Sequence, residues 1–371
     1  MNLLPFYLSS FYYFYFSIVG VYIIFMPKVL ADIGYSASEI GILFSAAPLV
    51  RVILPFLFQK GLSLNVKTFN TALLFMIVSS LSFYTTLHNF YALLLSNIFL
   101  GVGMSLTIPY IESIALESIG KQRYGKVRLF GSVGFILVAL VLVKFLQDPF
   151  TAIHFLVTMI CLSSIFGYIV VQKVHTKEKA SHQEQNTPIP LLRDYQLWIG
   201  LTLMQMSFGS FYNFFTIYET DHGVSMDTTI YLWSFGVVVE VLMLFFQGKL
   251  LEKNLLHILI FTTLATVLRW FLVFAFAQNL AVLFFAQSLH ALSFALFHSA
   301  AISYLFHLYK NKALAQQFFS GITYGLGGLV GAVLAGYIYE YFPKYLFLSS
   351  SFLAAGASLM LLLYAKKTSN P

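Results

Sequence analysis

Long apolar runs recur along the whole chain, and they restrict its fold more than any other feature. A helix needs roughly 20 apolar residues to cross the hydrocarbon core of a bilayer, which is about 30 Å thick. Only 9% of the residues are charged, against about 25% in soluble domains. A β-barrel would show short segments of alternating polarity instead. We therefore predict an all-α integral membrane protein with twelve transmembrane helices, near residues 5–27, 37–58, 68–87, 90–116, 127–147, 151–172, 196–219, 228–247, 256–277, 280–307, 315–340 and 344–365.

One long polar stretch divides these helices into six and six. It runs from Lys173 to Tyr195 and includes KVHTKEKASHQEQNTPIP, which has the composition of a solvated linker. We expect an N-terminal six-helix half over residues 1–172, a linker over 173–195 and a C-terminal six-helix half over 196–371.

The positions of the cations indicate the orientation. If the N terminus is cytoplasmic, 16 of the 21 lysines and arginines lie on the cytoplasmic side, and only Lys28, Lys144 and Lys344 lie toward the other. This positive-inside bias predicts cytoplasmic termini, a cytoplasmic linker and a net charge of +7 that needs no nucleic acid partner. The single cysteine, Cys161, offers neither an internal disulfide nor metal-ligand spacing, so we expect no metal and no cofactor.

The two halves also share residues at a nearly constant offset. The offset is 189 for four pairs and 190 for a fifth, and the pairs are Gly20/Gly209, Gly34/Gly223, Ser36/Ser225, Arg51/Glu240 and Gly131/Gly321. This predicts a duplication with two pseudo-symmetric halves. Two such halves joined by a linker are the arrangement of major facilitator transporters, which bind substrate between the halves near the bilayer midplane.

Ionisable residues inside spans are costly, and each is by default a candidate for function. Glu240 and Arg269 lie roughly 20 Å from opposite faces at 1.5 Å per residue, so we predict that they pair near mid-membrane. A carboxyl there can switch its charge, because arginine favours the ionised form and burial favours the neutral form. A proton-coupling role and a structural ion pair both remain open.

Glu112 and Arg128 lie near the cytoplasmic ends of adjacent predicted spans, where a snorkelling arginine is ordinary. Arg128, Gly131 and Phe135 nevertheless share one helix face, which suggests a guanidinium to hold an acceptor and a ring to stack on a substrate. If Glu112 pairs with Arg128 and Glu240 pairs with Arg269, Arg51 is left over. That surplus positive charge favours an anionic substrate.

Two further groups of residues each allow a functional and a structural interpretation. In QSLHALSFALFH, Gln287, His290 and Ser293 share a face, so His290 is either a proton relay or a hydrogen-bonded packing residue. The glycines permit close helix approach, either as static packing or as a gating seam, and they are Gly131, Gly134, Gly321, Gly325, Gly327 and Gly331. We interpret the aromatic run FYYFYF as packing residues and interface anchors in preference to a substrate cage, and Ser36 with Glu39 as a capping box.

Glu112 followed by YGKVRLFGSVGF resembles the lactose permease group of oligosaccharide:proton symporters. The resemblance implies sugar-binding roles for Glu112 and Arg128, with Phe135 in place of the stacking tryptophan. It likewise implies coupling roles for Glu240, Arg269 and His290. Gln287 and Ser293 replace the lysine and glutamate that this group uses on the same helix, which argues against a lactose-type cycle.

The chain is more similar to the phenylpropionate permease family, over essentially its full length. The shared text includes YGKVRLFGS, YLWSFGVVVEV, LRW at 268–270, LHALSFALFHSAAISY and GYSASEIGILFSAAPLVR. The resemblance implies a monomeric secondary transporter of the bacterial cytoplasmic membrane that works by alternating access. Proton-coupled uptake of a small organic solute, such as an aromatic carboxylate, is the activity it implies.

Three other functions remain as alternatives. An efflux antiporter and a sugar or nucleoside symporter share the predicted fold. A membrane enzyme or sensor is more remote, because the sequence contains no HExxH, no GxSxG and no paired catalytic aspartates. We therefore expect no catalytic residues.

Overall fold

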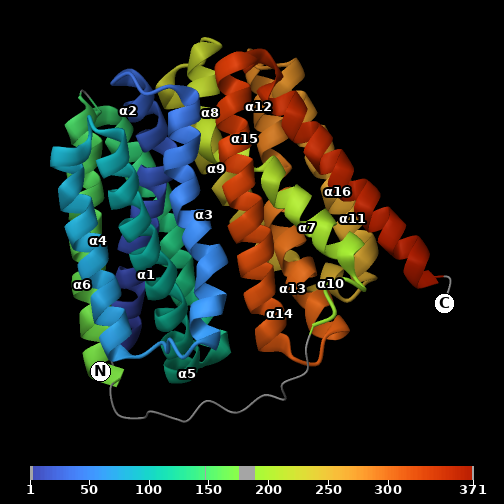
Figure 1. The fold of residues 1–371 in the computed structure, drawn as a ribbon, viewed down its shortest axis with the longest axis horizontal. Helices are drawn as coiled ribbons and strands as arrows, with labels where there is room; N and C mark the ends of the chain where they lie inside the picture. Colours follow the sequence, from blue (N-terminus) through green and yellow to red (C-terminus); the bar gives the residue numbers. More distant parts are fainter. Residues whose placement is uncertain (1–2, 147, 175–188, 370–371) are drawn as a thin grey trace. The chain divides into compact units, whose positions relative to one another are not determined.

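The computed structural model describes residues 3–146, 148–174 and 189–369, and within these ranges the regular structure is entirely helical. The chain divides into two compact units, one of Met1–Val50 with Phe56–Ser181, the other of Arg51–Pro55 with His182–Pro371. In Figure 1 the first unit runs from blue to green, and most of the second from yellow-green to red. Residues 175–188 of the predicted linker lie outside the described residues, and the predicted domain boundaries stay a prediction.

The first unit contains the first six predicted spans. Its first span is continuous through α1 (Leu4–Gly20), the π-helical η1 (Val21–Phe25) and α2 (Met26–Asp32). The others are α3 (Ala37–Gln59), α4 (Val66–Thr86), α5 (Phe90–Phe145) and α6 (Pro149–Val174). The long α5 holds two spans, because Gly120 adopts φ 73° and ψ 160° and interrupts the helical backbone there. A positive φ costs glycine little, since it has no Cβ.

The second unit repeats this plan with shorter pieces. Its elements are α7 (Tyr195–Ser207), α8 (Gly209–Asp221), α9 (Met226–Phe246), α10 (Gly248–Leu251), α11 (Leu255–Ala275), α12 (Leu280–Ser288), η2 (Ala291–Leu296), α13 (Phe297–Leu308), α14 (Lys312–Phe318), η3 (Phe319–Leu326), α15 (Gly327–Tyr341), η4 (Pro343–Tyr345) and α16 (Leu346–Ser369). Two of its predicted spans contain a π-helical stretch, η2 and η3, with an α-helix on either side.

Eleven helices in the described part of the chain are long and apolar enough to cross a membrane. The predicted span at 196–219 is the exception, because it is divided between α7 and α8, of 13 residues each. Phe208 separates them, with φ −79° and ψ −9°. Gly209, the next residue, packs so closely on α15 that a Cβ there would lie 2.2 Å from the Gly331 carbonyl oxygen. The break therefore lies where α8 meets α15.

The duplicated residues occupy equivalent structural positions. Gly34 and Gly223 both follow a helix end with positive φ, 104° and 87°. Three pairs of N-caps accept a backbone N–H from the first turn of the next helix, and they are Ser36/Ser225, Asn65/Asn254 and Asn89/Asn279. The predicted Ser36–Glu39 capping box is confirmed. These matches extend the repeat from sequence to local geometry.

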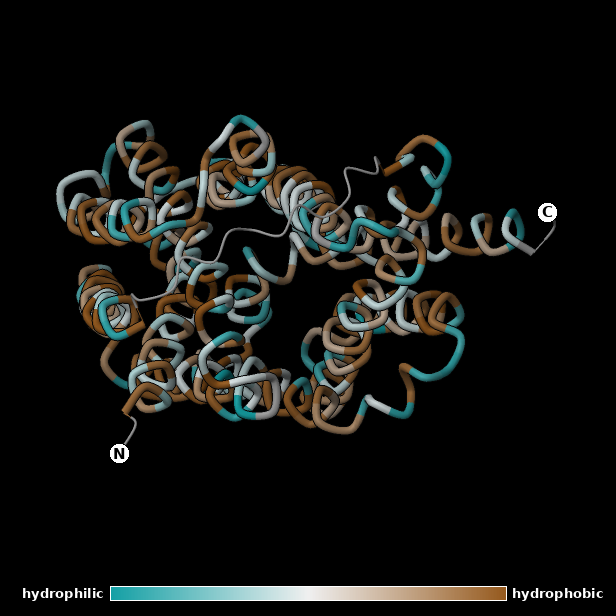
Figure 2. Tube along the Cα trace, turned by 90° about the horizontal axis from the view of Figure 1, so that it is seen from below, coloured by the Kyte–Doolittle hydropathy of each residue, from teal (hydrophilic) through white to brown (hydrophobic). Residues whose placement is uncertain are grey.

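Large apolar side chains cover much of the outside of both units. Phe245, Tyr91 and Phe352 are 81%, 80% and 68% exposed, and many leucines are exposed as well. Figure 2 shows hydrophobic residues along most of the helical trace, with hydrophilic residues at many of the turns. Soluble monomers rarely expose so much contiguous apolar surface. A bilayer around the helices removes it from water.

Candidate binding cluster in the first unit

Arg128 on α5 lies against aromatic rings of α1. Its guanidinium carbon is 3.8 Å from the Phe16 ring centroid and 5.5 Å from that of Tyr12. Gly131 makes this approach possible, because a Cβ there would lie 2.7 Å from the Phe16 ring and 2.8 Å from Nη1 of Arg128. A cation over an aromatic face is attracted by the negative face of the ring. The two rings therefore orient the guanidinium beside α1.

Glu112 joins this cluster. Its Oε1 accepts a hydrogen bond from Oη of Tyr124 at 3.1 Å and lies 3.7 Å from Nε of Arg128. The predicted Glu112–Arg128 pair is thus present, but long. The two side chains are 36% and 31% exposed, so the pair is reachable. In the described part of the chain no hydrogen bond restrains the Arg128 fork, which leaves its N–H groups for a ligand acceptor.

Phe135 lies two helical turns beyond Arg128 on α5. The residue is 8% exposed, and its carbonyl oxygen would lie 3.2 Å from a Cβ on Gly20. The rings over the guanidinium are those of Phe16 and Tyr12, which the sequence indicated as packing residues and interface anchors. Their i, i+4 spacing on one helix face is the signal that would have selected them. A substrate-stacking role for Phe135 stays a prediction.

Candidate proton cluster in the second unit

Arg269 on α11 is fully buried and makes three side-chain hydrogen bonds. Nη2 donates to Oε1 of Gln287 at 2.8 Å, while Nη1 reaches Nδ1 of His290 at 2.8 Å and Oγ of Ser293 at 2.9 Å. The prediction that Gln287, His290 and Ser293 share a face is confirmed, and Arg269 is what that face holds. Ser293 lies inside η2, which begins directly after His290. Such π-helical turns often occur at functional sites.

These contacts fix the tautomer of His290. Arginine has donors only, so Nδ1 of His290 must accept the hydrogen bond from Nη1. The ring proton then sits on Nε2, which lies 3.3 Å from Oε2 of Glu240 on α9. His290 is consequently neutral in this arrangement and joins the cation to the carboxylate.

The predicted direct Glu240–Arg269 pair is therefore wrong in its detail. No contact within ion-pair distance joins the two among the described residues, and His290 stands between them. Depth along two helices places two residues at one level, but it does not say which way each side chain points. Glu240 keeps 19% of its side chain exposed, whereas Arg269 has none.

Aromatic rings enclose the rest of the Arg269 guanidinium. Its carbon lies 4.3 Å from the Trp270 ring centroid, 4.5 Å from Phe211 and 5.7 Å from Phe208. Trp270 is itself held by a hydrogen bond from Nε1 to Oγ of Ser207, at 3.2 Å. Ring faces and three hydrogen bonds offset the cost of burying the charge. Nε of Arg269 has no hydrogen-bond partner in the described residues.

Arg51 belongs with the second unit, although it lies on α3. Its side chain is exposed, and within the described ranges no ion pair or hydrogen bond engages it. Its role in substrate binding stays a prediction.

The six predicted glycines are sites of close approach. A Cβ on Gly134 would lie 2.1 Å from the Tyr13 carbonyl oxygen, and one on Gly331 would lie 2.7 Å from that of Met206. Gly327 approaches Thr202 in the same way at 2.9 Å. Gly321 and Gly325 face the segment Arg51–Pro55, which belongs to the second unit. A Cβ on Gly325 would lie 2.9 Å from the Val52 nitrogen. A gating role for these glycines stays a prediction.

The fold is that of a multi-pass membrane transporter of the major facilitator type. The chain belongs to the MFS_1 like family, whose model matches residues 6–349. Its relatives and fold neighbours are transporters, not enzymes. No group of three or more histidine, cysteine, aspartate or glutamate residues able to hold a metal occurs in the described ranges.

Two relatives cover nearly the whole chain. One is a probable 3-phenylpropionic acid transporter of Escherichia coli (strain K12), 26% identical over 344 residues that span 89% of this chain and 90% of that protein. The other is the uncharacterized transporter YwbF of Bacillus subtilis (strain 168), 24% identical over 386 aligned positions, 97% and 94% of the two chains. Both are similar to this chain from end to end.

Solved structures share the fold at lower identity. The nucleoside transporter NupG superposes with a TM-score of 0.79 at 15% identity, covering 99% of this chain and all of that one. The POT family transporter PepTSo gives 0.77 at 10% identity, covering 98% and 97%. At such identity these likenesses establish the helical architecture and nothing about substrate.

Proposed function

We propose that this transporter is a proton-coupled symporter that takes up a small organic anion, with an aromatic carboxylate as the first candidate. The observation that carries the proposal is His290, held neutral between Arg269 and Glu240. A proton added to Nδ1 of His290 would face the N–H of Arg269, so two donors would oppose each other. Protonation therefore requires Arg269 to find another partner, and that couples proton uptake to side-chain rearrangement.

Glu240 is the proposed point of proton entry. It is the half-buried carboxyl of the second cluster, and its Oε2 contacts the His290 Nε2–H. A neutral Glu240 no longer balances the buried charge of Arg269, which then favours an anion or a rearranged partner. The buried cation would thus be bound differently in the protonated and unprotonated states, as alternating access driven by protons requires.

The first cluster supports the choice of substrate. Arg128 offers a planar fork that suits a carboxylate, while Phe16 and Tyr12 offer ring faces beside it. A carboxylate joined to a phenyl group presents both complementary features. The relative from Escherichia coli is described as a transporter of such a compound. Arg51, Glu112 and Phe135 remain proposed substrate contacts.

Uptake into proteoliposomes under an imposed pH gradient tests the coupling. Glu240→Gln should abolish accumulation of labelled 3-phenylpropionate while leaving counterflow exchange, because exchange needs no net proton movement. Glu252→Gln, at an exposed position outside the spans, is the matched control and should accumulate normally. Full accumulation by Glu240→Gln would remove its coupling role. If nucleosides or disaccharides competed and aromatic acids did not, the substrate would belong to one of those classes instead. Accumulation in the opposite direction would indicate antiport.

We further propose cytoplasmic termini in the inner membrane and a monomeric working unit. Single cysteines in a Cys161→Ser background test the orientation. Thr368→Cys should be protected from an impermeant thiol reagent applied outside cells, whereas Asn279→Cys should react. Light scattering of the purified protein in detergent tests the monomer, and a dimer mass would overturn it.

A further inference from the structure

The second unit contains a buried carboxyl that neither cluster uses. Glu219, near the end of α8, has no exposed side-chain surface. Neither of its carboxyl oxygens has a hydrogen-bond partner in the described residues. Buried polar groups are almost always hydrogen-bonded, and an isolated buried charge takes up or releases a proton instead of staying ionised. Among the described residues, Glu219 has neither a hydrogen-bond donor nor an ion-pair partner to stabilise a negative charge.

The internal repeat shows which residue occupies the equivalent position in the first unit. Glu219 corresponds to Leu30 at the 189-residue offset, and Leu30 is 2% exposed at the end of α2. The carbonyl oxygens of Leu30 and Glu219 each accept a backbone N–H five residues later, from Tyr35 and Val224, both at 3.0 Å. The same helix end therefore encloses a leucine in one unit and a carboxyl in the other. The architecture does not require a polar group here.

The titratable groups around Glu219 do not supply a partner. On its own helix Asp221 accepts from Oη of Tyr339 at 2.6 Å, and Nδ1 of His222 bonds the Tyr218 carbonyl oxygen at 2.7 Å. The elements packed on α8 add Tyr339 and Glu340 on α15 and Asp227 on α9, and Lys344 in η4 lines a pocket together with Tyr218 and His222. The phenols of Tyr218 and Tyr339 interact electrostatically with Glu219, and neither is a cation.

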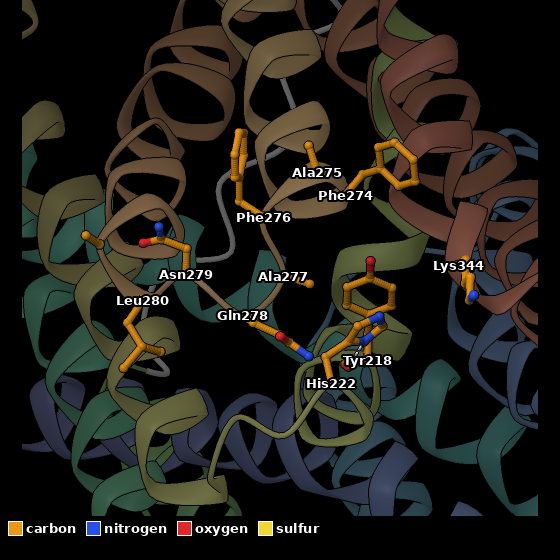
Figure 3. A pocket seen from close by; sticks show the side chains of 11 residues that line it. Tyr218, His222, Phe274, Ala275, Phe276, Ala277, Gln278, Asn279, Leu280 and Lys344 are labelled. Atoms are coloured by element: carbon orange, nitrogen blue, oxygen red, sulfur yellow. Dashed lines mark hydrogen bonds between the residues drawn. The ribbon is translucent and has the colours of Figure 1, made fainter.

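A pocket of about 820 Å³ reaches the neighbouring residues. Its lining includes Tyr218 on α8 and His222 directly after that helix, the segment from Phe274 to Ala281, and Lys344. Figure 3 shows Tyr218 and His222 together on one side of this space, with Gln278 near His222. The pocket is thus lined by Tyr218, the residue directly before Glu219 in the sequence, while the Glu219 carboxyl itself is buried.

We propose that Glu219 is a second proton-binding site of the transporter, which holds its proton as a neutral carboxylic acid in this conformation. It is separate from the Glu240–His290 pair and does not depend on the role proposed for that pair. Release of the proton requires hydration of this end of α8, and the adjoining pocket is the volume from which water would reach it.

Infrared spectroscopy of the purified protein tests this directly. At neutral pH the wild type should show the carbonyl stretch of a protonated carboxyl group, shifted to lower frequency in D₂O. Glu219→Gln should lose that band, and Glu240→Gln should retain it. An absent band in the wild type, or a band unchanged in Glu219→Gln, would overturn the proposal. The measurement needs neither substrate nor gradient, so its failure is distinct from a failure of coupling at Glu240.

Thermal unfolding provides a second readout. Glu219→Leu reproduces the residue of the first unit, and it should fold with an unchanged or higher midpoint. A lower midpoint for both Glu219→Leu and Glu219→Gln would mean that the wild-type carboxyl is ionised and paired, which contradicts the proposal.

Discussion

Nη1 of Arg269 lies 2.8 Å from Nδ1 of His290, and because arginine cannot accept, the imidazole must. The opposite ring nitrogen, Nε2, faces Glu240. The two nitrogens of one residue thus have different tasks, one in holding a buried cation and the other in contacting the carboxylate. The tasks can be separated by substitution.

His290→Asn and His290→Gln should divide these tasks. The Asn amide oxygen falls near the position of Nδ1, so His290→Asn keeps an acceptor for Arg269 and should unfold close to the wild-type midpoint without pH-driven accumulation. The amide of the longer Gln falls near the position of Nε2 and reaches toward Glu240, so the Arg269 guanidinium loses the acceptor that Nδ1 supplied. It should therefore be destabilised by about 1–3 kcal/mol. Thermal unfolding and proteoliposome uptake check both, and equal behaviour of the two variants would contradict the tautomer assignment.

Phe16→Ala should weaken substrate binding by roughly 2- to 30-fold, because it removes the ring under Arg128, a contact of about 0.5–2 kcal/mol. Phe14→Ala is the matched control on the same helix, since Phe14 stacks on Phe166 at 5.6 Å and not on the cation. Calorimetric titration with 3-phenylpropionate measures both affinities. If Phe14→Ala lost as much affinity as Phe16→Ala, the ring–guanidinium contact would not be the cause.

Gly209→Ala should destabilise the second unit by about 1–3 kcal/mol or more, because its new methyl group would meet the Gly331 carbonyl oxygen at 2.2 Å. Gly125→Ala is the control, since nothing lies within 4 Å of a Cβ there and alanine is the better helix former by about 1 kcal/mol. Thermal unfolding in detergent should move in opposite directions for the two. A harmless Gly209→Ala would show that α8 and α15 separate easily.

Tyr309→Phe tests a contact in the loop between α13 and α14. Burial is the main reason that the pKa of Tyr309 is raised; Trp198 opposes the shift and Asp194 adds to it, so the phenol keeps its proton at neutral pH. Its Oη donates to Oδ2 of the buried Asp194 at 2.8 Å and accepts from Nε1 of Trp198 at 3.2 Å. Removing it should cost about 1–3 kcal/mol in thermal unfolding. A change below the error of the measurement would mean that Arg193 alone satisfies Asp194.

Apolar run length and helical spacing were enough to predict much of this fold. Each span needs about 20 apolar residues whatever its neighbours, so the number and ends of the spans follow from local sequence. The shared face of Gln287, His290 and Ser293 also follows from spacing within one helix. The division of the span at 196–219 was missed, because it depends on the contact between Gly209 and the distant Gly331.

The contacts between helices were harder to predict. Depth along α9 and α11 placed Glu240 and Arg269 at one level, yet the rotation of each helix is set by packing, and His290 fills the space between them. Glu219 was overlooked because its place at the end of a predicted span resembles an ordinary interfacial residue. Only burial distinguishes it. Phe16 and Tyr12 were hidden in a run where almost every residue is aromatic.

The matched N-caps and glycines suggest how the two units diverged after a common ancestor was doubled. Residues that shape the backbone, such as Gly34 and Gly223, are the same in both copies. Ionisable residues differ between the copies, with Leu30 opposite Glu219 and Arg51 opposite Glu240. A scaffold of this kind lets each copy change its ionisable side chains independently, since such changes leave intact the turns that join the helices.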